Sequence, residues 1–282
     1  MRRTAPVFAL LALSAIPLTT RAGLWDLIRG YRDLEVITVT DINGFRQPAN
    51  PDRPQYYLAA SLGYRDLGAS IAGFSEPPPD KDVVHLLSSE LAKQGYFPAT
   101  AQSAPPTLLL VYTWGTLNAE RFYGADPSRY SQLNHGQMVR FLGGPKVGLN
   151  KDFFDPLTAP ALGLSVQSYA SQRIFEVARE DLYVIVVAAY DYSDALELKR
   201  RPPVWTTRIA APSLGFSFSN VFPAMLAIGG PQFGRDTPRP VWVNASDKFK
   251  PDVRLGELQL LEYLKGEPLP VKDVSDLPLE KE

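Results

Sequence analysis

The sequence predicts a single α+β domain in which helices pack on one face of a mixed β-sheet, with a long insertion after the second core strand. The prediction depends on two nearly unbroken apolar runs of strand length, residues 107–114 and 182–192, which are typical of strands covered on both faces. Elsewhere apolar residues recur every three to four positions, as on helices with one buried face. With 282 residues, 45% of them hydrophobic, the chain has enough material for one sizeable core.

Residues 1–22 have the form of a secretory signal peptide. Arg2 and Arg3 form a basic head, residues 5–18 are an apolar run, and Ala22 is a small residue suited to signal peptidase. As a helix the apolar run would rise about 21 Å, short of the roughly 30 Å hydrocarbon core of a membrane. We therefore expect cleavage after Ala22, a mature chain with no transmembrane span, and export to the periplasm, the outer-membrane periphery or the medium.

Turn and stop signals divide the rest of the chain. A proline-rich stretch at 48–54 separates an N-terminal extension from the core, and the glycines and proline at 229–231 end the last core helix. The expected organisation is a signal peptide at 1–22, an N-terminal extension at 23–54, a core domain at 55–230 with an insertion at 115–163, and a C-terminal extension and tail at 231–282.

Two helices are the most clearly marked elements of the core. One begins at Asp80, whose side chain is suited to cap the first turn, and ends before Gly95, a residue that readily adopts the left-handed conformation of a helix end. The other follows Ser219 with Pro223 in its first turn, and its residues 221–228 are apolar all round. Burial in the core is the favoured interpretation of 221–228, and contact with a membrane or a partner is the alternative.

The remaining elements follow from shorter patterns. β-branched and aromatic residues predict short strands, and apolar spacing predicts weaker helices. The expected elements are strands at 34–40, 55–64, 203–211 and 241–243, a helix at 165–180, and a short helix near 131–141 within the insertion.

Charge balance and residue usage exclude several kinds of chemistry. The chain has 29 Lys and Arg against 30 Asp and Glu, so it offers no basic field for a nucleic acid. It has no cysteine, which excludes disulfides, thiol catalysis and a lipid attached to an N-terminal cysteine. Two histidines fifty residues apart and the lack of a glycine-rich phosphate-binding motif predict neither a zinc site nor a nucleotide cofactor.

Three residues are candidates for a site, although none is assigned a catalytic, metal-binding or cofactor-binding role. His135 lies in the insertion, and Asp191 and Asp194 follow a central strand. The competing interpretations are a packed or surface histidine and a solvated acidic turn. His85 is expected on the surface of the first long helix, and no G-x-S-x-G motif supports a serine hydrolase.

Two stretches of the chain resemble a known family. Residues 83–96 (VVHLLSSELAKQGY) and 107–112 (TLLLVY) form a helix ending in L-x-x-x-G-Y followed by an apolar strand, and 182–191 (LYVIVVAAYD) precedes PVWTTRIA at 203–210. Together they resemble the domain of unknown function 4136 family of exported bacterial envelope proteins, many of them lipoproteins. The resemblance covers about residues 55–228 and implies an envelope location, with no catalytic residues to carry over. The chain departs from it in lacking the lipid-bearing cysteine and in its longer insertion.

We therefore expect an exported, non-enzymatic envelope protein that binds or scaffolds an envelope protein or glycan, without a cofactor. One alternative is a secreted glycan hydrolase with two carboxylates about 5 to 9.5 Å apart in an aromatic-lined cleft. Another is a small-ligand or glycan-binding module that uses the aromatic residues of the insertion. The tryptophans could stack on sugars, but packing is their favoured role. The sequence assigns no ligand and no oligomeric state.

Overall fold

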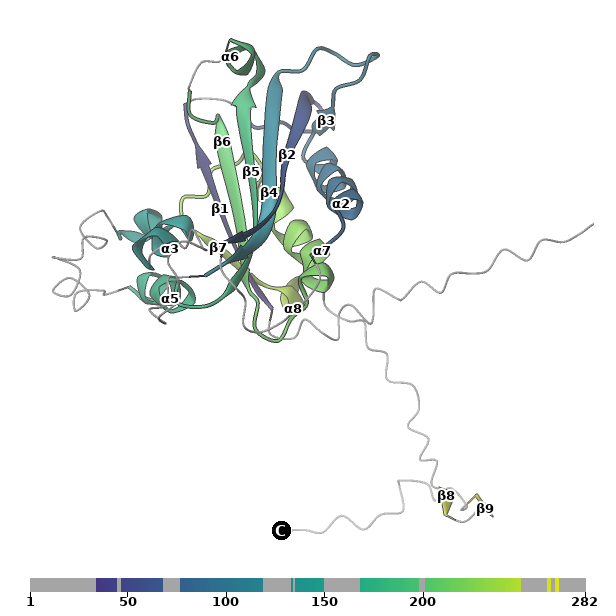
Figure 1. Cartoon of the computed structure of the whole chain (residues 1–282), viewed down its shortest axis with the longest axis vertical. Coiled ribbons are helices and arrows are strands. Elements are labelled where there is room, and N and C mark those ends of the chain that lie inside the picture. The colour runs from purple at the N-terminus through teal and green to yellow at the C-terminus, as the bar shows by residue number, and fades with distance from the viewer. Residues whose placement is uncertain are drawn as a thin grey trace, which may run out of the picture. The chain divides into compact units, whose positions relative to one another are not determined.

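The computed structural model describes residues 34–44, 47–67, 77–118, 133, 135–149, 168–197 and 201–249, with two short strands at 263–264 and 267–268. The chain divides into a compact unit, Met1–Phe249, and a second unit, Lys250–Glu282. In the described part of the first unit, seven strands form one sheet in the order β3-β2-β4-β5-β6-β1-β7 (Figure 1). β2 is parallel to β3 and β4, and all other neighbours are antiparallel. The predicted α+β class with a mixed sheet is confirmed.

The bounds of the elements are close to those expected from the sequence. The strands of the sheet are β1 (Glu35–Ile42), β2 (Gln55–Leu67), β3 (Tyr96–Pro98), β4 (Leu108–Leu117), β5 (Leu182–Asp191), β6 (Trp205–Pro212) and β7 (Val241–Asn244). The helices are α2 (Asp80–Lys93), α3 (His135–Phe141), α5 (Tyr169–Val177), α6 (Tyr192–Leu196), α7 (Phe218–Gly229) and α8 (Ala245–Lys248), with short 3-10 helices η1 (Gly144–Val147) and η4 (Gly230–Gln232). In the second unit, β8 (Tyr263–Leu264) and β9 (Glu267–Pro268) pair antiparallel. Residues 1–22, which the sequence predicts to be a signal peptide, and the greater part of the predicted insertion and tail lie outside the described residues.

The two apolar runs lie side by side in the middle of the sheet. β4 and β5 pair antiparallel over their full length, from Leu108 opposite Asp191 to Leu117 opposite Leu182. Leu110 and Trp114 are buried on one face of the sheet, and Leu117 and Val184 are buried on the other. Both faces are buried from Trp114 to Leu117 and from Leu182 to Ile185, whereas burial alternates over the rest of the two strands. Burial on both faces explains the unbroken apolar character of the first of these parts.

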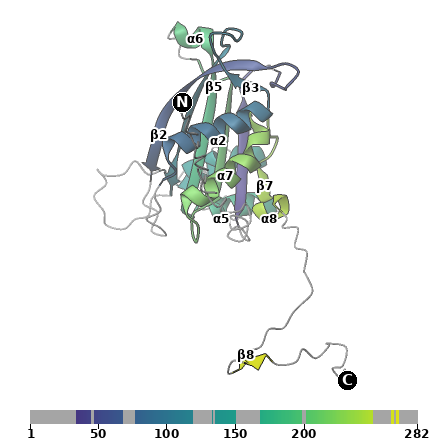
Figure 2. The ribbon, with the colours of Figure 1, turned by 90° about the vertical axis from the view of Figure 1, so that its right-hand side faces the viewer.

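Helices cover both faces of the sheet, so the prediction that they pack on one face is wrong. α2 and α7 lie side by side on one face, where Leu87 and Phe222 belong to the larger core cluster (Figure 2). α3, η1 and α5 pack on the other face, where Met138 and Ile174 belong to a second cluster. Their helical signals fall in the insertion and just after it. Local periodicity shows that a helix has an apolar side, but it does not show which face of the sheet that side meets.

The core extends further toward both termini than the predicted range 55–230. β1, which the sequence placed in an N-terminal extension, pairs with β6 on one side and with β7 on the other. Both partners lie about 160 to 210 residues further along the chain. The sequence predicts the strand at 34–40, but no local pattern indicates a partner at that separation along the chain.

Two details of the helix ends also differ from the predictions. Pro79, not Asp80, is the N-cap of α2, although Gly95 has the expected left-handed backbone with φ +87°. α7 begins after Ser217, so Pro223 is inside the helix and not in its first turn. The interpretation of 221–228 as buried core is confirmed, since Val221, Met225 and Leu226 are at most 1% exposed.

The pairing of β2 with β4 requires a glycine. A Cβ on Gly115 would lie 1.7 Å from the backbone oxygen of Arg65, across the strand pair. We expect Gly115→Ala to destabilise the fold by about 3 kcal/mol or more, because a backbone atom cannot give way as a side chain can. The urea midpoint of unfolding measures this, with Ser89→Ala on the exposed side of α2 as a control expected within about 0.5 kcal/mol of the parent. An unchanged midpoint in Gly115→Ala would show that β2 is not seated on β4 as described.

Candidate functional site

His135 has a packing role in the structure. It is the first residue of α3, and its ring stacks on Phe175 of α5 with centroids 5.6 Å apart. Its Nε2 lies 3.3 Å from the Phe175 carbonyl oxygen, which can only accept, so this nitrogen carries the proton. Burial lowers the pKa of His135, and the hydrogen bond to Phe175 opposes that shift. The ring therefore joins α3 to α5 within the second layer of helices.

Asp191 and Asp194 stabilise a surface turn where β5 ends and α6 begins. The Asp191 carboxylate caps α6 by accepting from the backbone N–H groups of Ser193 and Asp194. Asp194 forms an ion pair with Arg201 at 3.0 Å. Leu182, at the other end of β5, packs in the same cluster as residues of α3 and α5. The ten residues of β5 span about 30 Å, so this cluster is far from Asp191. The structure therefore does not bring His135 together with these aspartates.

The second histidine lies at a shallow cavity but does not form a catalytic arrangement. His85 is exposed on α2, beside a cavity of about 240 Å³ that Asp82, Ser219 and Phe222 also line. Within the described part of the chain, the His85 ring makes no hydrogen bond, so neither Asp82 nor Ser219 is paired with it. A nucleophile and its base must be within hydrogen-bond reach of each other.

A network of charged residues that the sequence analysis did not identify fastens η1 to the sheet. Lys146 donates to the carbonyl oxygens of Thr40 and Thr237 and pairs with Asp41 at 3.0 Å and Asp236 at 2.9 Å. Arg208 of β6 also pairs with Asp41. Burial lowers the pKa of Arg208, and Asp41 opposes that shift. Because both cations are matched by carboxylates, the network acts as a clamp between segments and offers no free charge to a ligand.

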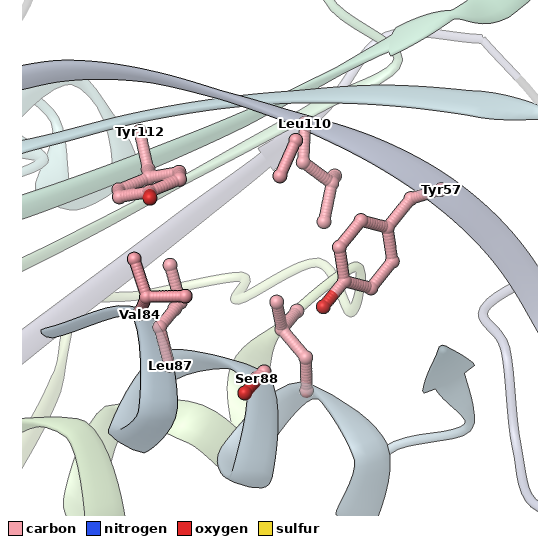
Figure 3. Close-up of a pocket in the computed structure, with 8 residues that line it drawn as sticks. Tyr57, Val84, Leu87, Ser88, Leu110 and Tyr112 are labelled. Atoms are coloured by element: carbon pink, nitrogen blue, oxygen red, sulfur yellow. The ribbon is translucent and has the colours of Figure 1, made fainter. Parts of the chain in front are cut away.

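An apolar pocket lies between α2 and the strands β2 and β4 (Figure 3). Tyr57 of β2 and Tyr112 of β4 face it from the sheet, and Val84 and Ser88 face it from α2. It is small, about 30 Å³, which corresponds to roughly two water-sized atoms. The full lining is Tyr57, Ala59, Val84, Leu87, Ser88, Leu91, Leu110 and Tyr112, with no charged side chain.

The polar side chains of this pocket are Tyr57, Tyr112 and Ser88, each with one hydroxyl. Neither Tyr57 nor Tyr112 has a hydrogen-bond partner for its hydroxyl in the described part of the chain. Burial, with a smaller contribution from Tyr112, raises the pKa of Tyr57 to about 12. Tyr57 is therefore neutral at physiological pH and has a proton to donate. A pocket with apolar walls and a few hydroxyl groups has the general chemistry of a binding site.

The pocket opens beside an unpaired strand edge. β3 pairs with β2 at residues 55–57, and the last main-chain bond runs from Ala99 N to the Tyr57 oxygen at 2.8 Å. Successive residues of a strand direct their main-chain groups to opposite sides, so those of Ala59 and Ser61 point to the same outer side as those of Tyr57. Among the described residues, no strand pairs with β2 on that side beyond Tyr57.

Exposed apolar side chains accompany this edge, which we call the β2 edge (residues 58–66). Leu58 is 40% exposed and Leu62 is 51% exposed, and Val84 across the pocket is 49% exposed. A register shift between Ser61 and Tyr64 marks a β-bulge, with Gly63 at φ +72°. Bulges and edge charges are common protections against unwanted pairing, but three large apolar residues remain exposed around this edge.

At the opposite side of the sheet, the main-chain groups of β1 beyond β7 have hydrogen-bond partners. Thr40, in the part of β1 that extends beyond β7, donates its N–H to the Thr237 hydroxyl at 2.9 Å, and Thr237 N donates to the Thr40 oxygen at 3.2 Å. Lys146 binds the same Thr40 oxygen. The chain thus satisfies the main-chain groups of β1 at this margin and leaves those of Ala59 and Ser61 without a strand partner among the described residues.

The alternative of a two-carboxylate hydrolase gains no support from these cavities. The apolar pocket has no acid in its lining, and the cavity beside His85 has one, Asp82. Trp114 and Trp205 are 1% and 3% exposed and pack in the core, so neither presents a face to a sugar. Within the described residues, no three His, Asp or Glu side chains gather as a metal site.

No helix in the described part of the chain is both long enough and apolar enough to cross a membrane.

Comparisons with known proteins assign no family. No protein-family model matches the chain, and no curated protein matches it, so the resemblance to the domain of unknown function 4136 family gains no support. Among solved structures, the crystal structure of a PDZ domain protein from Parabacteroides distasonis matches 74% of this chain and 38% of its own length, with 14% identity and a TM-score of 0.33. That TM-score is too low to carry an argument about fold or function.

The environment of Tyr57 predicts a loss of stability at high pH. The pKa in the folded state, about 12, is above the ordinary value of 10.0, so the stabilising contribution is complete below pH 10 and is lost as the pH rises toward 12. We expect the free energy of unfolding to fall less steeply over this range in Tyr57→Phe than in the parent, as measured by urea denaturation. Tyr169→Phe, which alters an exposed tyrosine, is expected to keep the parental slope. Parallel slopes for Tyr57→Phe and the parent would contradict a buried, protonated phenol.

Proposed function

We propose that the protein is an exported, non-enzymatic binding protein of the bacterial envelope, which binds an extended polypeptide segment as an additional strand along the β2 edge. The observation that carries the proposal is the position of the unpaired main-chain groups of Ala59 and Ser61 beside the apolar pocket. Strand addition to an exposed edge obtains affinity from main-chain hydrogen bonds and specificity from pockets for alternate side chains.

The geometry at the β2 edge suits an added strand of limited length. The outward N–H and C=O groups of Ala59 and Ser61 could form four main-chain hydrogen bonds with it. At one end the added strand would meet Ala99, which occupies the outer side of Tyr57. Leu58 and Leu62 would gain apolar contacts on the face opposite α2. Each feature favours a short extended peptide over a globular surface.

The proposed export is supported by the sequence of residues 1–22, with its basic head, apolar run and small residue at Ala22. The absence of cysteine in the chain is compatible with an oxidising compartment. Export predicts that the chain isolated from an expressing bacterium begins at Gly23. Isolation of the intact 282-residue chain alone would contradict that part of the proposal.

A display library of random ten-residue peptides tests the binding function. We expect selection against the purified chain to enrich peptides with alternating apolar residues that bind in fluorescence anisotropy titrations. Ser61→Pro removes one outward N–H from an edge where proline is tolerated, and it should weaken binding about tenfold, near the 1.4 kcal/mol of one lost hydrogen bond with its steric consequences.

The matched control is Ser61→Ala, which removes the side-chain hydroxyl but keeps the main-chain N–H. It should bind the selected peptides as the parent does. Circular dichroism of both variants establishes that they are folded. Failure of the library to yield any binding peptide, or equal binding by Ser61→Pro and the parent, would contradict strand addition at β2.

A further inference from the structure

We propose that two copies of the chain associate through the face of the sheet opposite α2, in the half that α3 and α5 leave uncovered. We call this half the open face and define it by two rows of residues that run across β2, β4 and β5. One row is Leu58, Leu109 and Tyr190, and the other is Ala60, Val111 and Ala188. The proposal does not rest on the proposed function, because it uses a face of the sheet and leaves the outer main-chain groups of β2 free.

The open face is apolar but only partly covered. Leu58 is 40% exposed, and the other five residues are half-buried. On the reverse side of the same strands, Leu110, Val187 and Ala189 are at most 1% exposed. Within the described part of the chain, none of the six open-face residues belongs to a core cluster or packs against one. A sheet face that stays in water usually carries polar residues, so this apolar one points to a partner that covers it.

The neighbouring half of the same face is already covered by helices. There Leu117 and Val184 are buried in one cluster with Met138 of α3 and Ile174 of α5. Figure 1 shows α3 and α5 beside the end of the sheet where β4 ends and β5 begins, and α6 at the opposite end. The open face lies between these helices and outside both core clusters.

Two observations favour a second copy of this chain as the partner. The six residues carry no charge, so bringing two open faces together opposes no like charges. The rows also differ in size, because the first holds a tyrosine and two leucines, whereas Ala60 and Ala188 flank Val111 in the second. A surface that meets its own copy must be self-complementary, and a row of large residues beside a row of small ones meets that condition.

The helices of the covered half fix the direction of the two-fold axis. Packed sheets lie about 10 Å apart, which is also about the diameter of a helix, so α3 and α5 fill the space that a second sheet would occupy. An axis parallel to the strands would place these helices of both copies at the same end, where they would collide. An axis across the strands, between the two rows, places them at opposite ends. It sets Leu58 over the partner's Ala60 and Tyr190 over the partner's Ala188, so that each large residue meets a small one.

The size of the open face predicts a weak dimer. Half-buried Tyr56 and Phe97 continue the apolar surface on one side of the two rows, and Val186 continues it on the other. With strands about 4.8 Å apart and a rise of about 3.3 Å per residue, the surface is about 20 Å long and about 15 Å wide. This footprint of about 300 Å² is below the roughly 800 Å² that each partner buries in a standard interface. We therefore expect a reversible dimer with a dissociation constant on the order of 10 µM.

Sedimentation velocity of the purified chain between about 1 and 100 µM tests the dimer, because its population must rise with concentration. Val111→Lys should weaken association about a hundredfold, since the axis relates two lysines and each buries an ammonium group without a counter-charge. The matched control is Val84→Lys, the same change at a residue of α2 that is 49% exposed and faces away from the open face. It should associate as the parent does, and circular dichroism establishes that both variants are folded.

Uncharged variants test the register of the two rows. Ala60→Leu should weaken association about tenfold, because it places a leucine against the partner's Leu58 in the space of a methyl group. Adding Leu58→Ala to Ala60→Leu exchanges the large and the small position, so the double variant should recover most of the parental affinity. These changes lie on an edge strand, and they keep the test available if Val111→Lys fails to fold.

Three results would overturn the inference. A chain that sediments as a monomer at every concentration has no such interface. A dimer that Val111→Lys and Val84→Lys leave equally intact is formed by another surface. A dimer that Ser61→Pro dissociates and Val111→Lys does not is formed by edge-to-edge pairing of β2. Failure of Leu58→Ala to rescue Ala60→Leu would contradict the proposed register.

Discussion

The antiparallel pair of β4 and β5 is the interaction on which the rest of the structure depends. Its ten residue pairs lie in the centre of the sheet and contribute buried side chains to the clusters on both faces. Strands buried on both faces cannot satisfy their main-chain groups with water, so each requires a strand on its other side. β2 supplies that strand for β4 and β6 supplies it for β5. The sheet therefore extends to both sides of this pair, and its two margins differ in how their main-chain groups are satisfied.

The site arises from the difference between those margins. At the margin beyond β1, a distant loop and Lys146 satisfy main-chain groups of Thr40. At the other margin, β3 has three residues against thirteen in β2, and it ends at Pro98. The next segment is a turn, which is closed by a hydrogen bond from Ser103 N to the Thr100 oxygen. The brevity of β3 leaves most of the β2 edge unpaired among the described residues, and a pocket lies between α2 and the strands β2 and β4.

The sequence predicted the elements whose signals are local. Apolar runs indicated β4 and β5, and three-to-four residue spacing with Gly95 indicated α2, because these patterns record burial directly. The placement of β1, the second layer of helices and the Lys146 clamp depend on contacts between residues far apart in the chain, which no local pattern contains. The site was missed for the same reason. Small residues at 59 and 61 and charges at Arg65 and Asp66 are typical of an edge strand, but the pocket requires knowing that α2 stands over Ala59.

Amide hydrogen exchange along β2 measures whether its outer edge is unpaired, because it reports main-chain pairing one residue at a time without a ligand. The N–H groups of Leu58 and Ala60 point toward β4, whereas those of Ala59 and Ser61 point outward. We expect alternation, with protection at Leu58 and Ala60 at least about a hundredfold greater than at Ala59 and Ser61. Uniform protection across these four amides in the isolated protein would mean that the outer edge of β2 is already occupied, and would contradict strand addition there.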